Sequence, residues 1–296
     1  MKYKAHDYQQ YATDFIIKHP VSCLILDMGL GKTVITLTAL WLLLFDYFEV
    51  RRILVIAPKR VAETTWPAEI KKWEHLYGMT FAVAMGTAGQ RKEALLSGAD
   101  VTIIGRDNVS WMTKNIFFDF DMVIIDELSS FKSPKAQRFK ELKKVRPMAK
   151  RVVGLTGTPG NLMDLWAEIG ILDMGQRLGR YIGGYRDRFF LPDKRNREII
   201  FSYKPREGAE EKIYELISDI SISMKAVDYL DMPECINNRV TVSMSESEQG
   251  LYDRMADEMI LEYGEGQDID AVNAAALSNK LQQMANGAVY DESGNV

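Results

Sequence analysis

The stretch that decides the fold is "LILDMGLGKTVITL", Leu24 to Leu37, where two glycines, a lysine and a threonine separate an apolar run from a helical pattern. Such a turn presents backbone N–H groups at the N-terminus of a helix, where a phosphate group is favoured. Gly29 and Gly31 let the backbone approach closely. Lys32 would reach the β- and γ-phosphates, and the Thr33 hydroxyl would bind Mg²⁺. We therefore predict that the phosphates of a nucleotide are held by Gly29, Leu30, Gly31, Lys32, Thr33 and Val34, and that Thr33 also binds Mg²⁺.

A second apolar run, "MVIIDELS", supports this interpretation because it ends in two adjacent carboxylates, Asp126 and Glu127. A carboxylate at the tip of a strand beside a phosphate loop can bind Mg²⁺, and its neighbour can activate the attacking water. The loop departs from the strict pattern at Leu26, where that pattern has a glycine. Taken together with the two carboxylates, the loop predicts ATP hydrolysis, with Lys32, Asp126 and Glu127 as catalytic residues.

The composition is that of an ordinary globular protein: 296 residues, 47% hydrophobic and 26% charged, with a net charge of −4. The N-terminus lacks the apolar core of a signal peptide, and the stretch from Val34 to Phe45 is too short to cross a bilayer. The two cysteines and three histidines have neither zinc-site nor disulfide-framework spacing. We therefore expect a cytoplasmic protein with no membrane partner.

Basic residues concentrate between Lys132 and Arg151, where nine cations stand against one acid, Glu141. From Thr241 onward the balance reverses, with eleven acids against two cations. Two interpretations of the basic run are open. It is either a solvated helix face or a rim that attracts polyanionic DNA.

Six runs rich in β-branched residues alternate with helical patterns: "CLILDM", "RRILVIAP", "FAVAMG", "VTIIGR", "MVIID" and "RVVGLTGT". This alternation predicts an α/β fold with a mainly parallel sheet, helices on both faces, and ligands at the carboxyl ends of the strands. Amphipathic spacing predicts helices over Val61 to Leu76 and Ala136 to Val145. Later patterns predict a short strand in "NNRVTVSMS" and a helix from Ser245 to Glu262 that begins with a capping box.

The ordered motifs resemble those of the superfamily 2 helicases, and within them the Swi/Snf-type DNA translocases with their compact prokaryotic and phage relatives. "DMGLGKT" is similar to the family's "DEMGLGKT", "LVIAPKRVAETTW" resembles motif Ia, "IIDELSSFKSPKAQRFKEL" resembles the "DEAH" box, and "LTGTP" matches motif III. "HDYQQYATDFI" resembles the adenine-reading Q motif, which makes Gln9 the base reader and Tyr8 its neighbour. The resemblance covers Tyr8 to about Trp166 and continues more faintly beyond.

The resemblance implies a RecA-like P-loop NTPase lobe at residues 1–172 and a mixed, mostly helical extension at residues 173–296. It implies contacts to the DNA backbone, independent of sequence, by Pro58, Lys59, Arg60, Arg106, Asp107, Asn108 and Lys132. Thr156, Gly157 and Thr158 are candidates for coupling nucleotide state to movement. The alternative is that the two threonines only terminate a strand with hydroxyl hydrogen bonds. The resemblance to prokaryotic and phage relatives implies that the protein acts in a prokaryotic or phage-infected cell.

Two departures from the family pattern bear on the activity. Ser129 stands where the "DEAH" box has histidine, and no "QxxGRxxR" motif occurs in the sequence. In the family this motif belongs to a second RecA-like lobe, whose arginines stabilise the transition-state charge. We therefore expect the chain to be the ATP-binding half of a DNA helicase or translocase, weakly active or inactive alone, that couples hydrolysis to movement when joined to that lobe.

Three alternatives stay open. An RNA helicase of the DEAD or DEAH type would be stimulated selectively by RNA. A nucleotide-gated binding module without turnover would bind ATP tightly with negligible hydrolysis. A small-molecule P-loop kinase would require a substrate lid, for which the sequence offers no candidate segment.

Overall fold

The computed structural model describes residues 1–157, 160–193, 202–230, 238–258, 260–262, 268–270 and 274–288. Contacts divide the chain into two compact units, Met1–Met232 and Pro233–Val296. The predicted coupling residue Thr158 lies outside the described residues.

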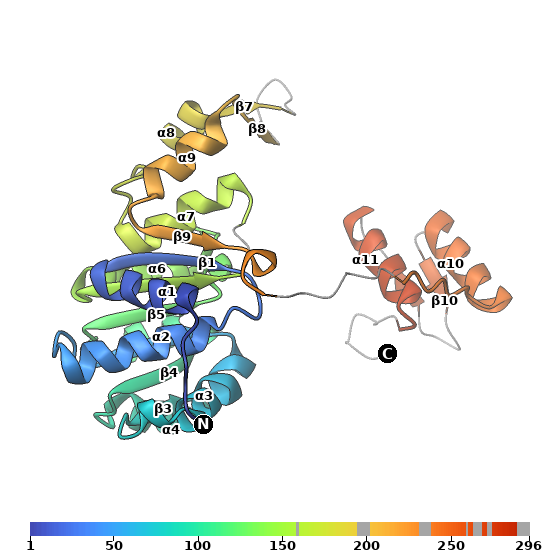
Figure 1. Cartoon of the computed structure of the whole chain (residues 1–296). Coiled ribbons are helices and arrows are strands. Elements are labelled where there is room, and N and C mark those ends of the chain that lie inside the picture. The colour runs from blue at the N-terminus through green and yellow to red at the C-terminus, as the bar shows by residue number, and fades with distance from the viewer. Residues whose placement is uncertain are drawn as a thin grey trace. The chain divides into compact units, whose positions relative to one another are not determined.

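The first unit is built on a seven-stranded sheet with the order β3-β4-β2-β5-β6-β1-β9 (Figure 1). Every neighbouring pair of strands in this sheet runs parallel. Its strands are β1 (Val21–Leu26), β2 (Ile53–Ala57), β3 (Phe81–Ala84), β4 (Val101–Gly105), β5 (Met122–Asp126), β6 (Arg151–Thr156) and β9 (Ser221–Met224). All but β9 coincide with the predicted runs, and the parallel sheet confirms the predicted α/β fold.

Helices cover both faces of this sheet. They are α1 (Asp7–Lys18), α2 (Lys32–Trp41), α3 (Trp66–Lys72), α4 (Ala88–Leu96), α5 (Val109–Asn115), α6 (Gln137–Val145), α7 (Leu162–Asp173), α8 (Ile182–Phe189) and α9 (Ala209–Ile217). A short hairpin, β7 (Phe190–Pro192) and β8 (Tyr203–Pro205), follows α8. Figure 1 shows α8, α9 and the hairpin together at one end of this unit.

The alternation of side chains along each strand produces two hydrophobic cores. Along β2, Leu54 and Ile56 belong to one core and Val55 and Ala57 to the other, because successive side chains point to opposite faces. The first core takes side chains from α5, α6 and α7, and the second takes them from α1, α2 and α3. Burial on both faces explains why the strands read as continuous apolar runs.

Three predicted elements differ from the structure. The helix predicted from Ser245 to Glu262 ends at Glu258, and Ile260–Glu262 form a strand instead. The predicted helix from Val61 to Leu76 is divided into a π-helical turn (Val61–Thr65), α3 and a 3₁₀ turn (Glu74–Leu76), with Trp73 in an extended conformation between the last two. The strand predicted in "NNRVTVSMS" is wrong for residues 238–245, which form no strand. Val240 and Val242 are 76% and 86% exposed there, so their β-branched side chains have no sheet to pack against.

The first unit extends beyond the boundary expected after residue 172. The reason is β9, which pairs with β1 across nearly two hundred residues of sequence, with Cys23 opposite Ser221 and Leu26 opposite Met224. The compact unit therefore continues to Met232. The 173–296 extension contributes both to this unit and to the second one.

The second unit contains α10 (Glu246–Glu258), α11 (Ala274–Ala285) and a hairpin of β10 (Ile260–Glu262) and β11 (Asp268–Asp270). The predicted capping box is confirmed: Ser245 N donates to Glu248 Oε2 at 2.8 Å, and Glu248 N donates to Ser245 Oγ at 3.3 Å. Met255 packs against Leu251 and Leu281 in a small apolar cluster. Among the described residues of both units, every helix is too short or too polar to cross a bilayer.

Candidate nucleotide and nucleic-acid site

The predicted site residues gather at one edge of the sheet. Because the strands run parallel, their carboxyl ends meet there, and ligands of open α/β folds bind outside that edge. The segments that leave this edge are the phosphate loop after β1, Pro58 after β2, Arg106 after β4, Glu127 after β5 and Gly157 after β6. The fold therefore brings the phosphate loop, the Asp126-Glu127 pair and Gly157 of the "LTGTP" motif to the same edge of the sheet.

The phosphate loop has the backbone that its glycines permit. Gly29 and Gly31 have φ angles of +89° and +83°, in the left-handed region that favours glycine. A Cβ atom at Gly31 would lie 2.7 Å from Gln9 Nε2, so this position also has no room for a larger residue. Leu30 and Val34 are buried, so any contact that they make to a nucleotide would come from the backbone.

Lys32 begins α2 and lies between the loop and the predicted carboxylates. Its Nζ donates to Leu26 O at 2.7 Å and Asp27 O at 3.2 Å. Burial lowers the pKa of Lys32, while the negative charges of Asp126, Glu127 and Asp27 oppose that shift. The charges of Asp126 and Glu127 thus act on the Lys32 ammonium group. This is consistent with a role for Lys32 at the phosphates.

Asp126 ends β5 and is held by a side chain from motif Ia. Trp66 Nε1 donates to Asp126 Oδ2 at 2.8 Å, and the Trp66 side chain is fully buried. Burial raises the pKa of Asp126, and the adjacent Glu127 charge adds to the rise, while the Trp66 hydrogen bond opposes it. A cation beside this carboxylate would reverse the shift, because an opposite charge favours the ionised form.

Glu127 follows directly in a strained conformation. Its φ angle is +59°, which is uncommon for a residue other than glycine and costs of order 1–3 kcal/mol. The hydroxyl of Ser129 donates a hydrogen bond to Glu127 Oε1. The residue that replaces the family histidine therefore orients the predicted base.

Thr156 and Gly157 of the "LTGTP" motif lie beside the phosphate loop. Thr156, at the end of β6, is 2% exposed and pairs in register with Ile25 of β1. A Cβ atom at Gly157 would lie 3.6 Å from Lys32 Nζ. Gly157 thus borders the position where Lys32 would meet a phosphate.

The donor set of the site fits Mg²⁺. This cation prefers oxygen ligands and is commonly held by one or two carboxylates together with substrate phosphates and water. Asp126 supplies a carboxylate, whose Oδ2 also accepts from Trp66, and Thr33 supplies a hydroxyl in the first turn of α2. Among the described residues, no group of three His, Cys, Asp or Glu side chains could hold a metal.

Gln9 lies against the loop, as the Q motif predicts. Its Nε2 donates to Leu30 O at 3.2 Å, and its Oε1 accepts from His6 N at 3.1 Å and Tyr3 OH at 3.2 Å. These partners fix the orientation of the amide and use both acceptor positions of Oε1. One N–H of Gln9 remains for a ligand.

The predicted nucleic-acid residues divide into two groups. Lys59 and Arg60 are exposed just after β2. Asp107 accepts an ion pair from Arg138 at 3.0 Å, and Lys132 lies 3.8 Å from Asp164 of α7. Lys59 and Arg60 are therefore more available to a phosphate backbone than Asp107 and Lys132.

The basic run beyond the Asp-Glu pair is partly structural. Arg146 and Arg151 are buried, at 7% and 6% exposed. Four further cations make ion pairs: Lys132 with Asp164, Arg138 with Asp107, Lys144 with Glu141 and Lys150 with Asp121. Within the described part of the chain, Lys135 and Lys140 are exposed and make no ion pair. The ninth cation, Lys143, is half-buried, with its Nζ 5.9 Å from the centroid of the Phe139 ring. The rim interpretation therefore depends mainly on Lys135 and Lys140.

Sequence reasoning missed the supporting residues Trp66, Ser129 and Asp27. Asp27 Oδ2 accepts from Ala226 N at 2.9 Å, which ties the segment after β9 to the start of the loop. Trp66 and Asp27 lie within recognised motifs, but the sequence does not indicate that Trp66 contacts Asp126 or that Asp27 contacts Ala226. Ser129 was visible only as a departure from "DEAH".

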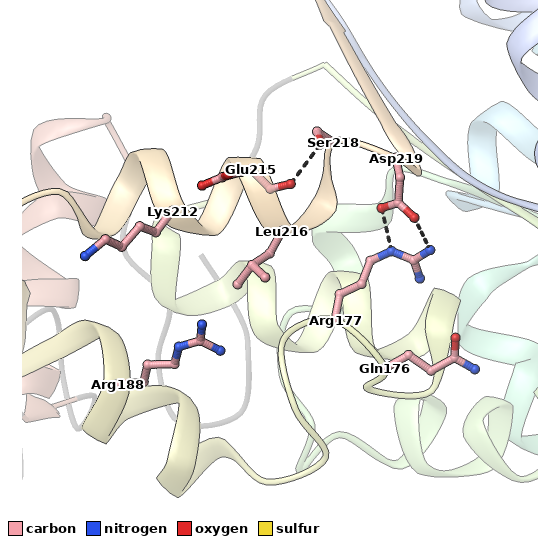
Figure 2. A pocket seen from close by; sticks show the side chains of 8 residues that line it. All are labelled: Gln176, Arg177, Arg188, Lys212, Glu215, Leu216, Ser218 and Asp219. Carbon is pink, nitrogen blue, oxygen red and sulfur yellow. Dashed lines mark hydrogen bonds and ion pairs between the residues drawn. The ribbon is translucent and has the colours of Figure 1, made fainter.

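A separate hollow of about 600 Å³ lies between the end of α7, α8 and α9 (Figure 2). Arg177 Nε donates to Asp219 Oδ1 at 2.7 Å across it, and Arg188, Lys212 and Glu215 line the remainder. Asp219 precedes β9, so the hollow adjoins the amino edge of the sheet, opposite the phosphate loop. It is therefore no part of the candidate nucleotide site.

Comparisons with known proteins agree with this geometry. The SNF2-related domain family matches residues 8–288. Protein p41 of Acyrthosiphon pisum secondary endosymbiont phage 1 is 36% identical over 277 residues, which cover 90% of this chain and 60% of p41. The human DNA annealing helicase and endonuclease ZRANB3 is 28% identical over 81% of this chain and 22% of its own length. The chain thus spans less than two thirds of these relatives.

A solved structure, the Sulfolobus solfataricus SWI2/SNF2 ATPase core in complex with dsDNA, superposes with a TM-score of 0.65. The two chains are 24% identical, and the match covers 88% of this chain and 53% of the other. At this identity the superposition shows the fold alone.

Proposed function

The chain belongs to the SNF2-related family, and from that premise we propose that it is the first RecA-like lobe of an ATP-driven DNA helicase or translocase. The observation that carries the proposal is the meeting of Lys32, Asp126 and Glu127 at one edge of a parallel sheet. This arrangement suits phosphoryl transfer to water, in which positioning and charge stabilisation do most of the work.

Each residue has a distinct role in the proposed reaction. The backbone N–H groups from Gly29 to Val34 bind the phosphates, and Lys32 neutralises charge on the γ-phosphate. Asp126 and Thr33 would hold Mg²⁺, which neutralises phosphate charge when bound. Glu127, oriented by Ser129, accepts a proton from the water that attacks the γ-phosphate.

Duplex DNA is the proposed nucleic-acid partner. The match to the SNF2-related family favours DNA over the RNA-helicase alternative, and the relative ZRANB3 is by its name a DNA annealing helicase. Lys59 and Arg60 are exposed, and we propose that they contact DNA phosphates, which would make binding independent of sequence. We propose that Gly157 and the threonines beside it couple nucleotide state to movement.

A second RecA-like lobe is part of the proposal, because the transition-state arginines of related enzymes contribute a factor of about 10³ to 10⁵ to turnover. The protein would then act on DNA in the cytoplasm of a prokaryotic or phage-infected cell. Without that lobe, the chain would behave as a nucleotide-gated binding module.

The experiment is to measure ATP hydrolysis without nucleic acid, with duplex DNA and with RNA, for the protein joined to its second lobe and for its Glu127→Gln variant. We expect duplex DNA to stimulate hydrolysis more than RNA does. We expect Glu127→Gln to bind ATP normally and to lose turnover, because the amide cannot accept the proton. Normal hydrolysis by Glu127→Gln would show that the base has been assigned wrongly.

A further inference from the structure

The segment that follows β9 borders the phosphate loop. Ala226 N donates to Asp27 Oδ2 at 2.9 Å, and Asp27 N donates to Met224 O at 3.1 Å, so two hydrogen bonds fasten this segment to the start of the loop. Leu230 Cδ1 lies 4.0 Å from the position of a Cβ at Gly29. Residues 224–230 therefore form a wall beside the phosphate loop.

An aromatic cluster joins this wall to the Q motif. The rings of Tyr229 and Tyr8 are 4.9 Å apart between centroids, and the rings of Tyr8 and His6 are 5.6 Å apart and stacked. Tyr8 is 7% exposed, whereas Tyr229 is 46% exposed. Tyr8 is thus the buried support, and Tyr229 presents the accessible ring.

The neighbouring Gln9 can supply only a limited part of base recognition. Both acceptor positions of its Oε1 are used by His6 N and Tyr3 OH, and one N–H of its Nε2 is used by Leu30 O. Gln9 can therefore offer one hydrogen-bond donor to a base. Contact with a flat surface would add to this hydrogen bond, and the half-exposed ring of Tyr229 offers such a surface.

We propose that Tyr229 is the residue on which the nucleotide base stacks, with Tyr8 supporting its ring from behind. This inference deepens the proposed function and rests on it, because it concerns the base that belongs to phosphates held by Gly29 to Val34. Stacking on an aromatic ring accepts any base with a π face, so Tyr229 determines affinity for the nucleoside part and leaves phosphate binding unchanged.

The test compares ATP with inorganic tripolyphosphate, which has the phosphates and no base, by calorimetric titration of the full chain. Tyr229→Ala is expected to weaken ATP binding roughly tenfold and to leave tripolyphosphate binding within about twofold of the wild type. Tyr229→Phe keeps the ring and is expected to bind both like the wild type. Tyr229→Leu keeps bulk without a π face and is expected to resemble Tyr229→Ala.

Tyr77→Ala is the matched control, because Tyr77 is 92% exposed on the same unit and belongs to none of the segments at the site. Unchanged ATP binding by Tyr229→Ala would overturn the stacking proposal alone. Equal losses for ATP and tripolyphosphate would also overturn it, since they would mean that Tyr229 supports the loop. A wild type that binds neither compound would overturn the proposed function, and the stacking role with it.

Discussion

The Ser129 hydroxyl donates a hydrogen bond to Glu127 Oε1, two residues back along the chain. Glu127 has a left-handed backbone conformation directly after β5. The serine therefore orients the carboxylate, whereas the histidine of the related "DEAH" sequence is expected to connect the γ-phosphate to other motifs.

This relationship predicts the effect of removing the hydroxyl. Ser129→Ala is expected to lower kcat about three- to tenfold with KM for ATP little changed, because only the positioning of the base is affected. Ser129→Thr keeps a hydroxyl and is expected to recover most of the loss. The measurement is steady-state ATP hydrolysis by the protein joined to its second lobe.

Ser130→Ala is the control for this comparison, because the Ser130 hydroxyl is buried and makes no hydrogen bond within the described residues. A kcat for Ser129→Ala equal to that of the wild type would leave the base oriented by some other group.

Glu168 predicts a pH dependence of stability. It is 1% exposed on α7, and burial raises its pKa from 4.5 to about 7, with a further rise from Asp164 and Glu127 that Lys132 opposes. The folded protein therefore holds this proton more tightly than the unfolded chain does. The free energy of unfolding should fall as pH rises from about 5 to about 7, by about 3 kcal/mol in all from this group.

Denaturant unfolding at pH 5 and pH 8 measures this effect. Glu168→Gln cannot ionise, so it is expected to lose this part of the pH dependence and to be more stable than the wild type at pH 8. Glu211→Gln, at an exposed position on α9, is expected to keep the wild-type dependence. A Glu168→Gln variant with the wild-type dependence would mean that Glu168 ionises at its ordinary pKa.

The basic run predicts a salt effect on DNA binding. Replacing Lys135, Arg138 and Lys140 together with alanine should flatten the dependence of log Kd on log salt concentration. The slope should change by about one unit for each DNA phosphate that the variant no longer neutralises. Most of this change should come from Lys135 and Lys140, because Arg138 is paired with Asp107.

Fluorescence anisotropy of labelled duplex DNA at several salt concentrations measures this slope. Arg188→Ala combined with Lys212→Ala removes two cations at the hollow near the opposite edge of the sheet and should keep the wild-type slope. An unchanged slope in the triple variant would identify the run as a solvated face.

Much of this site could be predicted from the sequence because its main residues lie within short motifs. The turn around Gly29 and Gly31 and the carboxylates after β5 are local features, since chain direction alone carries parallel strands to a common edge. The pairing of β9 with β1 could not be predicted, because "SISM" is only four residues long and its partner strand is distant in the sequence. The contact between Tyr229 and Tyr8 depends on that pairing.

The same limit explains the strand wrongly predicted in "NNRVTVSMS". Alternating β-branched residues fit a pleated surface, but a strand also needs a neighbour to satisfy its backbone groups. Val240 and Val242 are exposed, without a neighbouring strand among the described residues. The alternating β-branched residues therefore indicate a β-strand propensity, but residues 238–245 form no strand.

Titration of the chain and of Lys32→Ala with ATP and Mg²⁺ tests whether the carboxyl edge of the sheet is a nucleotide site. Lys32 would make a charge-assisted contact to the phosphates, so the variant is expected to bind at least about tenfold more weakly. Lys18→Ala, at the exposed end of α1, should bind like the wild type. Equal affinities for the wild type and Lys32→Ala would contradict the account.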